Sequence, residues 1–576
     1  MAMAQMSGVP KLEDDAEAAA AEEPWPPAMR EKERQRRRVL LVAGLMALPL
    51  LAFLFLGRDS ANMVWEIASA KLNSMNQQDH KAGFANASHG HGHVHGDELL
   101  GGLLAPGMDR PSCRSRYELS SYFKRFPYAP SPYLLGKLRA YEALHRRCAP
   151  GTPLYAKAVE QLKSGVSGGA GAMECRYVVW LPFDGLGNRM LSMASGFLYA
   201  LLTGRVLLAA IPPDSADLFC EPFPNTTWLL PAEDFPVANL FWLGASPDVS
   251  LTSLLKSNKI AVDVGGGDTP PAARNATAAP PVPAYVYLSL GWQMTDGPFF
   301  CGEHQVALGK VDWLLLFSDL YFVPSLYQVA EFQPELRRLF PETKESAAHL
   351  LLRYLLRPTN PVWDLVTAYY DANLAPAARR ISLQIRMFGF ASIAADDYYK
   401  QILACSAQEH VLPEPDGGGG NGSSTTTAIF IASLYPDYYK RLTARYAAPN
   451  AAAGERVVGV FQRTHEQRQA THNLQHNQRA LAEIYLLSFS EELMTSGMST
   501  FGYVSSSLAG VRPAILLPAY NHRVPATPCR RAVSMEPCNL TPPRGVECHG
   551  KAVDKEDFER HVKVCEDREV GVKFFD

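Results

Sequence analysis

The residues best suited to binding an anion lie in the segment Phe183-Asp-Gly-Leu-Gly-Asn-Arg189. Gly185 and Gly187 let the backbone come close to a ligand, and an apolar helix-like pattern begins directly after them. The segment therefore predicts a turn that leads into a helix N-terminus, where free N–H groups favour negative charge. Asn188 and Arg189 add polar side chains. A Gly-x-Gly turn also occurs as a purely structural turn, so residues elsewhere must decide between the two interpretations.

A second candidate is Arg386, at the end of the strand predicted over residues 381–387. Alternation along this strand places Gln384 and Arg386 on one polar face. A guanidinium group in that position can hold a diphosphate through paired hydrogen bonds. The alternative is an ordinary ion-pair or surface arginine.

Two further segments precede predicted helices. Ser499-Thr-Phe-Gly-Tyr503 follows a predicted strand, and Ser499 or Thr500 can cap a helix whose N-terminus cradles phosphate. In the segment 471–480, His476 and Arg479 are placed to contact the phosphates or sugar of a nucleotide. The alternatives are a helix cap without a ligand for the first segment and a solvated helix start for the second.

The motif inventory points away from metal chemistry. The chain has no Walker loop, HExxH helix or CxxC pair, and Asp396-Asp397 is adjacent rather than spaced. The histidine tract at 89–96 is better read as flexible linker than as a metal site. We therefore expect a sugar nucleotide held by arginine and helix dipoles, with no metal and no cofactor.

The elements that must position these residues alternate along the chain. Expected helices cover 480–487 and 500–508, and expected strands cover 177–182, 205–211, 381–387, 428–434, 457–461, 493–495 and 514–517. Such alternation predicts an α/β fold of doubly wound parallel sheets, and the chain is long enough for two such units facing a cleft. Ligands bind at the carboxyl ends of the strands in these sheets.

The start of the chain predicts membrane topology. Residues 39–56 form a run without charge, flanked on the N-terminal side by a basic cluster. This predicts a transmembrane signal anchor with a cytosolic tail at 1–38, although a cleaved signal peptide is the competing interpretation. All ten cysteines lie beyond the run, which suits disulfides in an oxidising lumen. Candidate glycosylation sites on the same side are Asn86, Asn225, Asn275, Asn421 and Asn539.

The remaining chain divides by composition. A disordered stem is expected over 57–110, followed by an N-terminal, acceptor-side Rossmann-like domain at 111–345 and a C-terminal nucleotide-binding Rossmann-like domain at 346–520. A cysteine-rich extension over 521–576 is expected to pack on both domains. The stretches 265–283 and 417–427 are low-complexity surface insertions. A net charge of −3 gives no field that attracts nucleic acid, so nucleic-acid binding is not expected.

Taken together, these motifs resemble the plant xyloglucan fucosyltransferases, in the same order over about residues 170–570. The blocks that carry the resemblance are Phe183–Arg189, Leu218–Pro224, Trp228–Pro231, Phe317–Leu326, Arg357–Asn360, Gln384–Arg386, His476–Glu483, Ser499–Tyr503 and Ser534–Cys538. The resemblance implies a GT-B-like fold, two facing Rossmann-like domains with a cleft between. It also implies an inverting, metal-independent transfer of L-fucose from GDP-fucose to a galactose 2-hydroxyl.

The same resemblance implies roles for individual residues. Arg386 would bind the GDP diphosphate, and Asp319 would position or deprotonate the acceptor hydroxyl, unless it is only a loop carboxylate tied to an N–H. The expected donor-binding set is Gly185, Gly187, Asn188, Arg189, Gln384, Arg386, His476, Asn477, Arg479, Ser499, Thr500, Phe501, Gly502 and Tyr503. One departure stands out, because the family usually has an aspartate close after this arginine and the chain has Met387-Phe-Gly-Phe390.

The acceptor stays open between galactosylated xyloglucan and an arabinogalactan-protein glycan. The departure at Gly389 also motivates a different class of function, a non-catalytic family member that acts as a binding or scaffold partner. The resemblance implies a single-pass type II protein of the Golgi membrane with a lumenal catalytic region. A homodimer, or a complex with other wall glycosyltransferases, is the assembly considered.

Overall fold

The computed structural model describes residues 99–168, 173–245, 247–260, 281–292, 294–415, 426–447, 458–552 and 555–575. The predicted tail, signal anchor and histidine tract lie outside these ranges, as do most of both low-complexity insertions. None of the helices in the described ranges has the length and apolar character that crossing a bilayer requires.

The first sheet has four parallel strands in the order β2-β1-β4-β3. They are β1 (Tyr177–Pro182), β2 (Val206–Ala209), β3 (Tyr285–Ser289) and β4 (Trp313–Ser318). Strand β1 is buried along its whole length, as expected for a strand covered on both faces. The two central strands, β1 and β4, come from distant parts of the sequence.

The second sheet has the order β10-β9-β8-β5-β6-β7. Its strands are β5 (Arg379–Ile385), β6 (Thr427–Ser433), β7 (Val458–Gln462), β8 (Glu492–Ser496), β9 (Ala514–Leu516) and β10 (Cys529–Arg531). Strands β5–β9 are parallel and lie in the Rossmann order, with β5 at the centre. Strand β10 adds an antiparallel edge next to β9. Because both faces of β5 are covered, even the polar side chain of Gln384 is buried.

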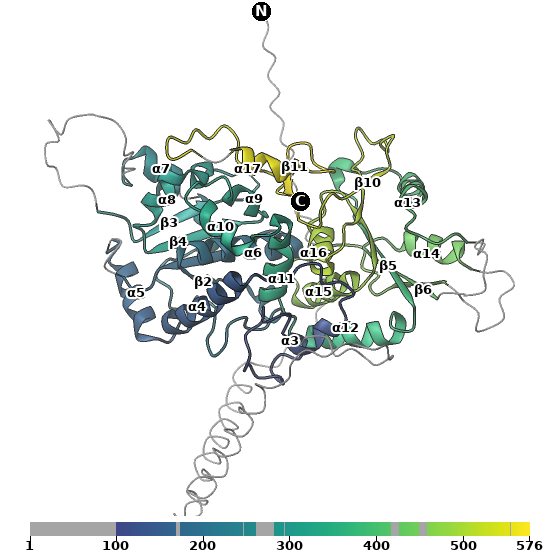
Figure 1. The fold of residues 1–576 in the computed structure, drawn as a ribbon, viewed down its shortest axis with the longest axis horizontal. Coiled ribbons are helices and arrows are strands. Elements are labelled where there is room, and N and C mark those ends of the chain that lie inside the picture. Colours follow the sequence, from purple (N-terminus) through teal and green to yellow (C-terminus); the bar gives the residue numbers. More distant parts are fainter. Residues whose placement is uncertain are drawn as a thin grey trace, which may run out of the picture. The chain divides into compact units, whose positions relative to one another are not determined.

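Helices cover both sheets and pack between them (Figure 1). The α-helices are α3 (Ser115–Glu118), α4 (Pro132–Cys148), α5 (Pro153–Lys163), α6 (Leu186–Thr203), α7 (Leu251–Lys256), α8 (Gly302–Leu308), α9 (Val323–Leu326), α10 (Gln333–Leu339), α11 (Ala347–Leu355), α12 (Asn360–Asn373), α13 (Ala395–Glu409), α14 (Pro436–Arg445), α15 (Leu474–Ser488), α16 (Thr500–Ala509) and α17 (Lys555–Arg560). Helix α6 follows β1, and it contacts α16, α11 and α15, which lie beside the second sheet. We call the part of the fold built around β1–β4 the first lobe and the part built around β5–β10 the second lobe. One large apolar cluster runs through both lobes and includes residues of α6, α11, α15 and α16.

The segment 99–110, expected to be part of a disordered stem, is packed. Leu103 and Leu104 are buried in the main apolar cluster. Arg139 on α4 donates to the carbonyl oxygens of Gly102 and Leu103, at 3.1 and 3.0 Å. The expectation of disorder up to residue 110 is therefore wrong for this segment, because its short leucine pair supplies apolar surface that α4 buries.

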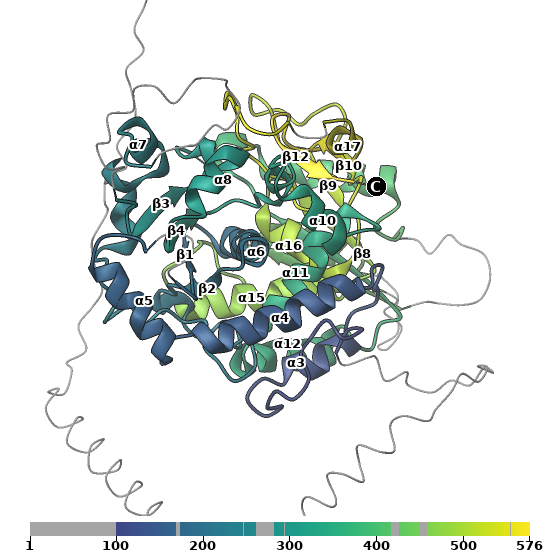
Figure 2. The same ribbon diagram turned by 60° about the vertical axis from the view of Figure 1, so that its left-hand side comes forward.

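The C-terminal region crosses both lobes. It supplies edge strand β10, a hairpin of β11 (Val562–Val564) and β12 (Val572–Phe574), and helix α17 (Figure 2). All ten cysteines are paired, as Cys113–Cys220, Cys148–Cys175, Cys301–Cys548, Cys405–Cys529 and Cys538–Cys565. Cys405–Cys529 ties the region to the second lobe and Cys301–Cys548 ties it to the first.

Candidate active site

Both sheets place their polar turns at the point where the strand order reverses. In the first sheet, β1 and β4 are central neighbours, so the turn after β1 and Asp319 after β4 emerge side by side. In the second sheet, β5 and β8 are neighbours, so Arg386 and the Ser499 turn emerge side by side. A ligand crevice is expected at such positions in doubly wound sheets.

The two turns meet across the lobes. A Cβ atom on Gly187 would stand 2.7 Å from Thr500 Oγ1 and 2.8 Å from the backbone nitrogen of Phe501. Thr500 Oγ1 also donates to the side-chain oxygen of Asn188. The N-termini of α6 and α16 therefore touch, and only a glycine fits at position 187 without displacing the α16 backbone. Their free N–H groups and dipoles converge on one region, which favours an anion there.

Arg386 borders this region with its guanidinium largely uncommitted. Its backbone N–H donates to Ser496 Oγ at 2.8 Å, which fixes the end of β5 against β8. Its Nη2 donates to Gln469 Oε1 at 3.0 Å, and Gln469 Nε2 lies 3.2 Å from the position of a Cβ on Gly185. Among the described residues no carboxylate pairs with Arg386, and the side chain of Gln469 accepts its hydrogen bond instead.

Asp319 is a buried carboxylate at the end of β4. Its Oδ1 accepts the backbone N–H of Trp292 at 3.0 Å, and its side chain packs against Gly291. Burial, and next the negative charge of Asp184, raise the pKa of Asp319 to about 6. Asp184 itself accepts a hydrogen bond from Asn188 Nδ2 at 2.8 Å, which links the carboxylate pair to the α6 turn. A carboxyl group with a pKa near 6 changes its protonation state close to neutral pH.

Aromatic side chains stand beside this carboxylate pair. Trp292, whose N–H holds Asp319, is 62% exposed, and Phe183, next to Asp184, is 44% exposed. The Phe183 ring rests on Phe317 with centroids 4.7 Å apart. Exposed aromatic surface near polar groups is typical of a ligand-binding rim.

Several residues of the expected donor set are packed rather than open. Arg189 donates to Asp214 Oδ1 at 2.6 Å and to Ser215 Oγ at 2.7 Å, so its guanidinium holds a neighbouring loop. Gln384 Oε1 accepts the N–H of Ser496 at 3.2 Å. These contacts assign both side chains to shaping the turns around the crevice.

The start of α15 shows the same pattern. Asn477 Nδ2 donates to the carbonyl oxygens of Asp214 and Thr471, at 2.9 and 2.8 Å, and so joins α15 to the first lobe. His476 and Arg479 both contact the carboxylate of Glu466. Of these side chains Arg479 is half-buried, whereas His476 and Asn477 are buried.

The residues at the start of α16 also differ in their burial. Thr500 and Phe501 are half-buried, whereas Ser499, Gly502 and Tyr503 are buried. A Cβ on Gly502 would stand 2.8 Å from Thr495 Cβ, so this glycine serves close helix–strand packing. The hydroxyl of Tyr503 points away from the crevice and donates to Asp567 Oδ2 at 2.7 Å.

One cluster in the described ranges has the composition of a metal site, Cys301, Glu303 and His304. Cys301 is bonded to Cys548, and Glu303 accepts the N–H groups of His549 and Gly550. A disulfide sulfur is not a thiolate, so these residues do not form a metal site.

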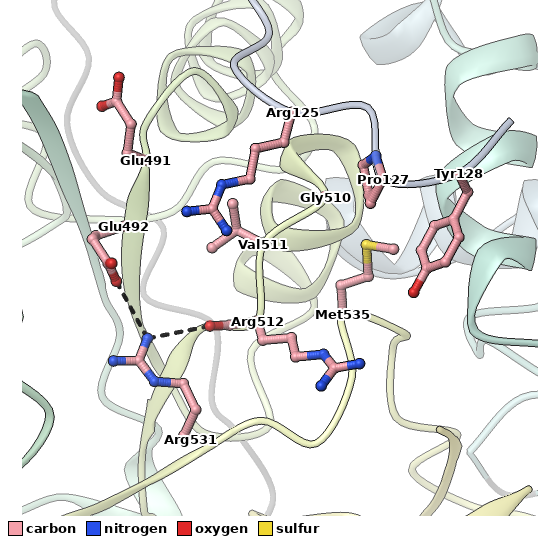
Figure 3. Close-up of a pocket in the computed structure, with 10 residues that line it drawn as sticks. All are labelled: Arg125, Pro127, Tyr128, Glu491, Glu492, Gly510, Val511, Arg512, Arg531 and Met535. Carbon is pink, nitrogen blue, oxygen red and sulfur yellow. Dashed lines mark hydrogen bonds and ion pairs between the residues drawn. The ribbon is translucent and has the colours of Figure 1, made fainter. Parts of the chain in front are cut away.

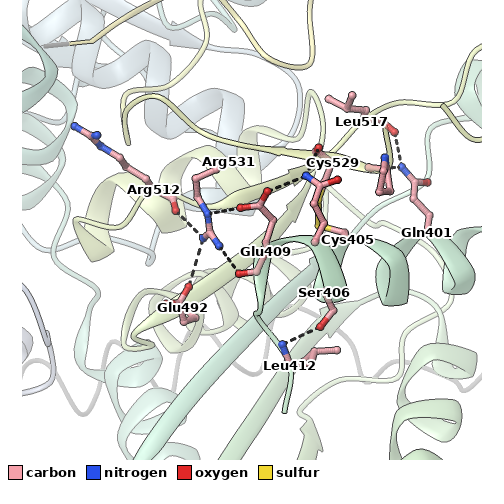
Figure 4. The surroundings of a disulfide bond; sticks show 12 residues. Gln401, Cys405, Ser406, Glu409, Leu412, Glu492, Arg512, Leu517, Cys529 and Arg531 are labelled. Atoms are coloured by element: carbon pink, nitrogen blue, oxygen red, sulfur yellow. Dashed lines mark hydrogen bonds and ion pairs between the residues drawn. A yellow bond between two sulfur atoms is a disulfide. The ribbon is translucent and has the colours of Figure 1, made fainter. Parts of the chain in front are cut away.

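Two cavities lie away from the crevice. One of about 280 Å³ is lined by Arg125, Pro127, Tyr128, Glu491, Glu492, Gly510, Val511, Arg512, Arg531 and Met535 (Figure 3). It opens where β8 begins and α16 ends, the edge opposite Arg386. The other, of about 480 Å³, borders Cys529 of the Cys405–Cys529 disulfide, where Arg531 contacts Glu409 and Glu492 (Figure 4). Neither cavity contains a residue of the expected donor set.

The candidate glycosylation sites differ in access. Asn225 is exposed with a φ of 56°, whereas Asn539 is fully buried and its Nδ2 donates to Ser325 Oγ at 2.9 Å. The folded chain therefore gives a glycan no access to Asn539, which corrects that expectation. Asn86, Asn275 and Asn421 lie outside the described residues.

Sequence reasoning did not single out Asp184, Gln469 or Asp567. Asp184 stands inside the quoted glycine motif, and its left-handed φ of 59° is a conformation that aspartate tolerates. Gln469 and Asp567 carry no local signal, since they reach the site only through the fold.

Known proteins are similar to this chain over most of its length. Residues 70–549 match the xyloglucan fucosyltransferase family model. Probable fucosyltransferase 8 of Arabidopsis thaliana is 43% identical over 490 residues, 83% of this chain and 91% of that protein. The galactoside 2-alpha-L-fucosyltransferase of Pisum sativum is 42% identical over 488 residues, 83% of this chain and 82% of that protein.

A solved structure is also similar. It is an arginine-to-lysine mutant of Arabidopsis thaliana FUT1 in complex with GDP, with a TM-score of 0.72 and 41% identity over 83% of this chain and 100% of that one. The family match at residues 70–549 spans every strand of both sheets. This chain belongs to the xyloglucan fucosyltransferase family and is a glycosyltransferase.

Proposed function

We propose that the protein transfers L-fucose from GDP-fucose, with inversion and without a metal, to the 2-hydroxyl of a galactose residue on a cell-wall polysaccharide such as xyloglucan. The observation that carries the donor assignment is the convergence of the α6 and α16 N-termini beside an arginine with no carboxylate partner among the described residues. The similar FUT1 structure holds GDP, and a similar protein carries the name galactoside 2-alpha-L-fucosyltransferase.

In this mechanism the donor diphosphate lies against the α6 and α16 N-termini, with Arg386 on one side. As the bond between fucose and GDP breaks, negative charge grows on the leaving diphosphate. Arg386 and the free N–H groups of the two turns stabilise that charge, because they are already oriented toward it. Gln469 would release Arg386 Nη2 to the diphosphate when the donor binds.

On the acceptor side, Asp319 would accept the proton of the attacking hydroxyl. With a pKa of about 6 it is ionised at neutral pH and more basic than an ordinary aspartate, and the Trp292 N–H fixes the direction of one carboxylate oxygen. The exposed rings of Trp292 and Phe183 offer apolar surface to the sugar that carries the hydroxyl. Holding that hydroxyl in line with the donor supplies the orientation that an inverting displacement needs.

The proposal includes a Golgi location, with residues 39–56 as the signal anchor of a single-pass type II protein and the catalytic region in the lumen. The location of every cysteine on one side of that segment supports it, because disulfides persist in oxidising compartments. Arabinogalactan-protein glycan remains the alternative acceptor.

The test uses Arg386→Ala and Arg386→Lys in the purified lumenal region. Losing a charged hydrogen bond to the diphosphate costs about 1.5–3 kcal/mol, so transfer should fall about tenfold or more in Arg386→Ala. Arg386→Lys keeps the charge but loses the paired geometry and should recover only part. Full activity in a folded Arg386→Ala variant would disprove the role.

The acceptor is identified by offering GDP-fucose with galactosylated xyloglucan oligosaccharides and, separately, with arabinogalactan. Product formation on xyloglucan supports the proposed acceptor, and product only on arabinogalactan selects the alternative. Binding of GDP without turnover on either acceptor, while a related enzyme turns over, would instead support a non-catalytic partner.

A further inference from the structure

The turn that begins α16 is held from outside its own lobe by Asp567. A single oxygen, Asp567 Oδ2, accepts the backbone N–H of Met498 at 2.6 Å and the hydroxyl of Tyr503 at 2.7 Å. Met498 precedes the helix and Tyr503 lies in its first turn, so the two bonds bracket the four residues Ser499 to Gly502. Two of the bracketed residues, Thr500 and Phe501, are the ones that meet Gly187 of α6.

The backbone at this point needs such a partner. Met498 has a φ of 60°, a left-handed conformation that is unfavourable for an ordinary side chain. Its N–H has the Asp567 carboxylate as acceptor. A Cβ on Gly497 would stand 3.0 Å from Asp567 Cβ and 2.8 Å from the Leu516 carbonyl oxygen, so the carboxylate is pressed directly against the turn.

Asp567 is carried by a rigid part of the C-terminal region. It lies between the strands of the β11–β12 hairpin, two residues after the Cys538–Cys565 disulfide. The adjacent Glu566 accepts the Val533 N–H at 2.7 Å and pairs with Lys573 at 3.3 Å. The hairpin cannot move without breaking these contacts, so the position of the carboxylate is fixed.

Asp567 could act on the turn as a hydrogen-bond acceptor or as a negative charge, and its surroundings distinguish the two roles. Asp567 is 7% exposed, and its other oxygen, Oδ1, has no hydrogen-bond partner. Burial raises its pKa, so the charged form is disfavoured beside a site meant for an anion. An asparagine could keep both bonds through its single carbonyl oxygen and place its amide where Oδ1 now lies. The geometry thus requires an acceptor rather than a charge.

We propose that Asp567 is a positioning residue of the donor site, which holds Met498 in its left-handed conformation and anchors Tyr503, and thereby aims the N–H groups of Thr500 and Phe501 at the donor diphosphate. The C-terminal hairpin is then part of the donor site although it contributes no contact to the donor itself. This inference rests on the proposed function, since it assigns the α16 turn to the diphosphate.

The experiment compares GDP affinity by titration calorimetry, and KM for donor and acceptor, in four variants of the lumenal region. Asp567→Ala removes both bonds and should weaken GDP binding about tenfold or more, with acceptor KM little changed. Asp567→Asn should stay within about threefold of the parent, since a neutral acceptor suffices. Tyr503→Phe removes one bond and should fall between them. Glu566→Gln weakens the contacts of the hairpin with Val533 and Lys573 but keeps both Asp567 bonds, so its loss of GDP affinity should be smaller than that of Asp567→Ala.

The possible results distinguish a failure of the proposed function from a failure of the role given to Asp567. If the parent protein does not bind GDP, the proposed function fails. If the parent binds GDP and a folded Asp567→Ala binds it equally well, the inference is wrong. Equal losses in Asp567→Asn and Asp567→Ala would show that charge is needed, and an equal loss in Glu566→Gln would show general loosening; both would also overturn it. If Asp567→Ala does not fold, unchanged GDP affinity in Tyr503→Phe overturns the inference.

Discussion

At the scale of single residues, burial and neighbouring charge decide what a side chain can do. Asp319 and Asp184 both follow strands of the first sheet, but Asp319 is buried and Asp184 is exposed. Burial, with Asp184 adding to it, raises the pKa of Asp319 to about 6. A carboxylate accepts a proton only when it is ionised, so the acceptor-activating form is lost as the pH falls through that value.

We therefore expect kcat/KM to fall on the acid side with an apparent pKa near 6. Asp184→Asn removes the neighbouring charge, lowers the pKa of Asp319 and should move this limb to lower pH. Asparagine suits the left-handed backbone of residue 184 and its side-chain oxygen can still accept from Asn188 Nδ2. The measurement is the pH profile of kcat/KM for parent and variant.

Asp319→Asn supplies the control, since it should lower kcat by about 10²-fold or more while GDP still binds. Two results would mean that a group other than Asp319 titrates. One is a fall of kcat/KM on the acid side that occurs at the same pH in Asp184→Asn as in the parent; the other is the same fall in the residual activity of Asp319→Asn.

At the scale of elements, the crevice depends on how closely α6 approaches α16. Gly187→Ala would put a methyl group 2.7–2.8 Å from Thr500 and Phe501. Two of these contacts are with backbone atoms, Phe501 N and the carbonyl carbon of Thr500, which cannot rotate away, so the two N-termini must separate, at a cost of about 1–3 kcal/mol. We expect a lower melting temperature together with weaker GDP binding, measured by thermal unfolding and calorimetry.

Gly136→Ala is the matched control for this prediction. Gly136 lies within α4, exposed, with nothing within 4 Å of an added Cβ. The same substitution there should stabilise the protein by about 0.5–1 kcal/mol and leave GDP affinity unchanged. If Gly187→Ala behaved like Gly136→Ala, the close approach of α6 and α16 would not be required.

The elements that sequence periodicity could identify are those with local signals. Strands β1, β2 and β5–β9, helix α16 and the start of α6 were predicted to within a few residues, because apolar runs, alternation and glycine turns bound them. Helix α15 was expected from residue 480 but begins at Leu474. Strand β4 was not predicted. Its core, Trp-Leu-Leu-Leu-Phe, is apolar at every position and gives no period that separates a strand from a helix.

The candidate site could be predicted only where its residues sit in motifs. Arg386 and Ser499–Tyr503 follow predicted strands, and parallel topology then brings them together. Asp319 came from family resemblance alone, since its strand was missed. Gln469 and Asp567 could not be found from sequence, because their contacts join segments that are 83 and 69 residues apart.

At the scale of the whole molecule, buried polar side chains join the lobes where disulfides do not. Glu536 in the C-terminal region accepts the hydroxyl of Tyr321 from the first lobe at 2.5 Å and the N–H of Ala348 on α11 at 2.7 Å. The side chain is 1% exposed. Removing the carboxyl would leave both donors buried and unpaired, so its hydrogen bonds are required for the lobes to pack.

Burial raises the pKa of Glu536 to about 8, so the folded protein holds this proton at pH values where the unfolded chain has released it. The folded state then binds more protons than the unfolded state, and stability falls as the pH rises from the ordinary value of 4.5 to about 8, by up to about 1.4 kcal/mol per pH unit.

Glu536→Gln has no proton to lose, while its carbonyl and amide can still form hydrogen bonds with Ala348 and Tyr321. We expect the free energy of unfolding of this variant in urea to depend less on pH than that of the parent. The stability of the variant relative to the parent should therefore increase between pH 5 and pH 8. Glu556→Gln, on exposed α17, should follow the parent at every pH, and a Glu536→Gln curve parallel to the parent's would show that Glu536 is ionised in the fold.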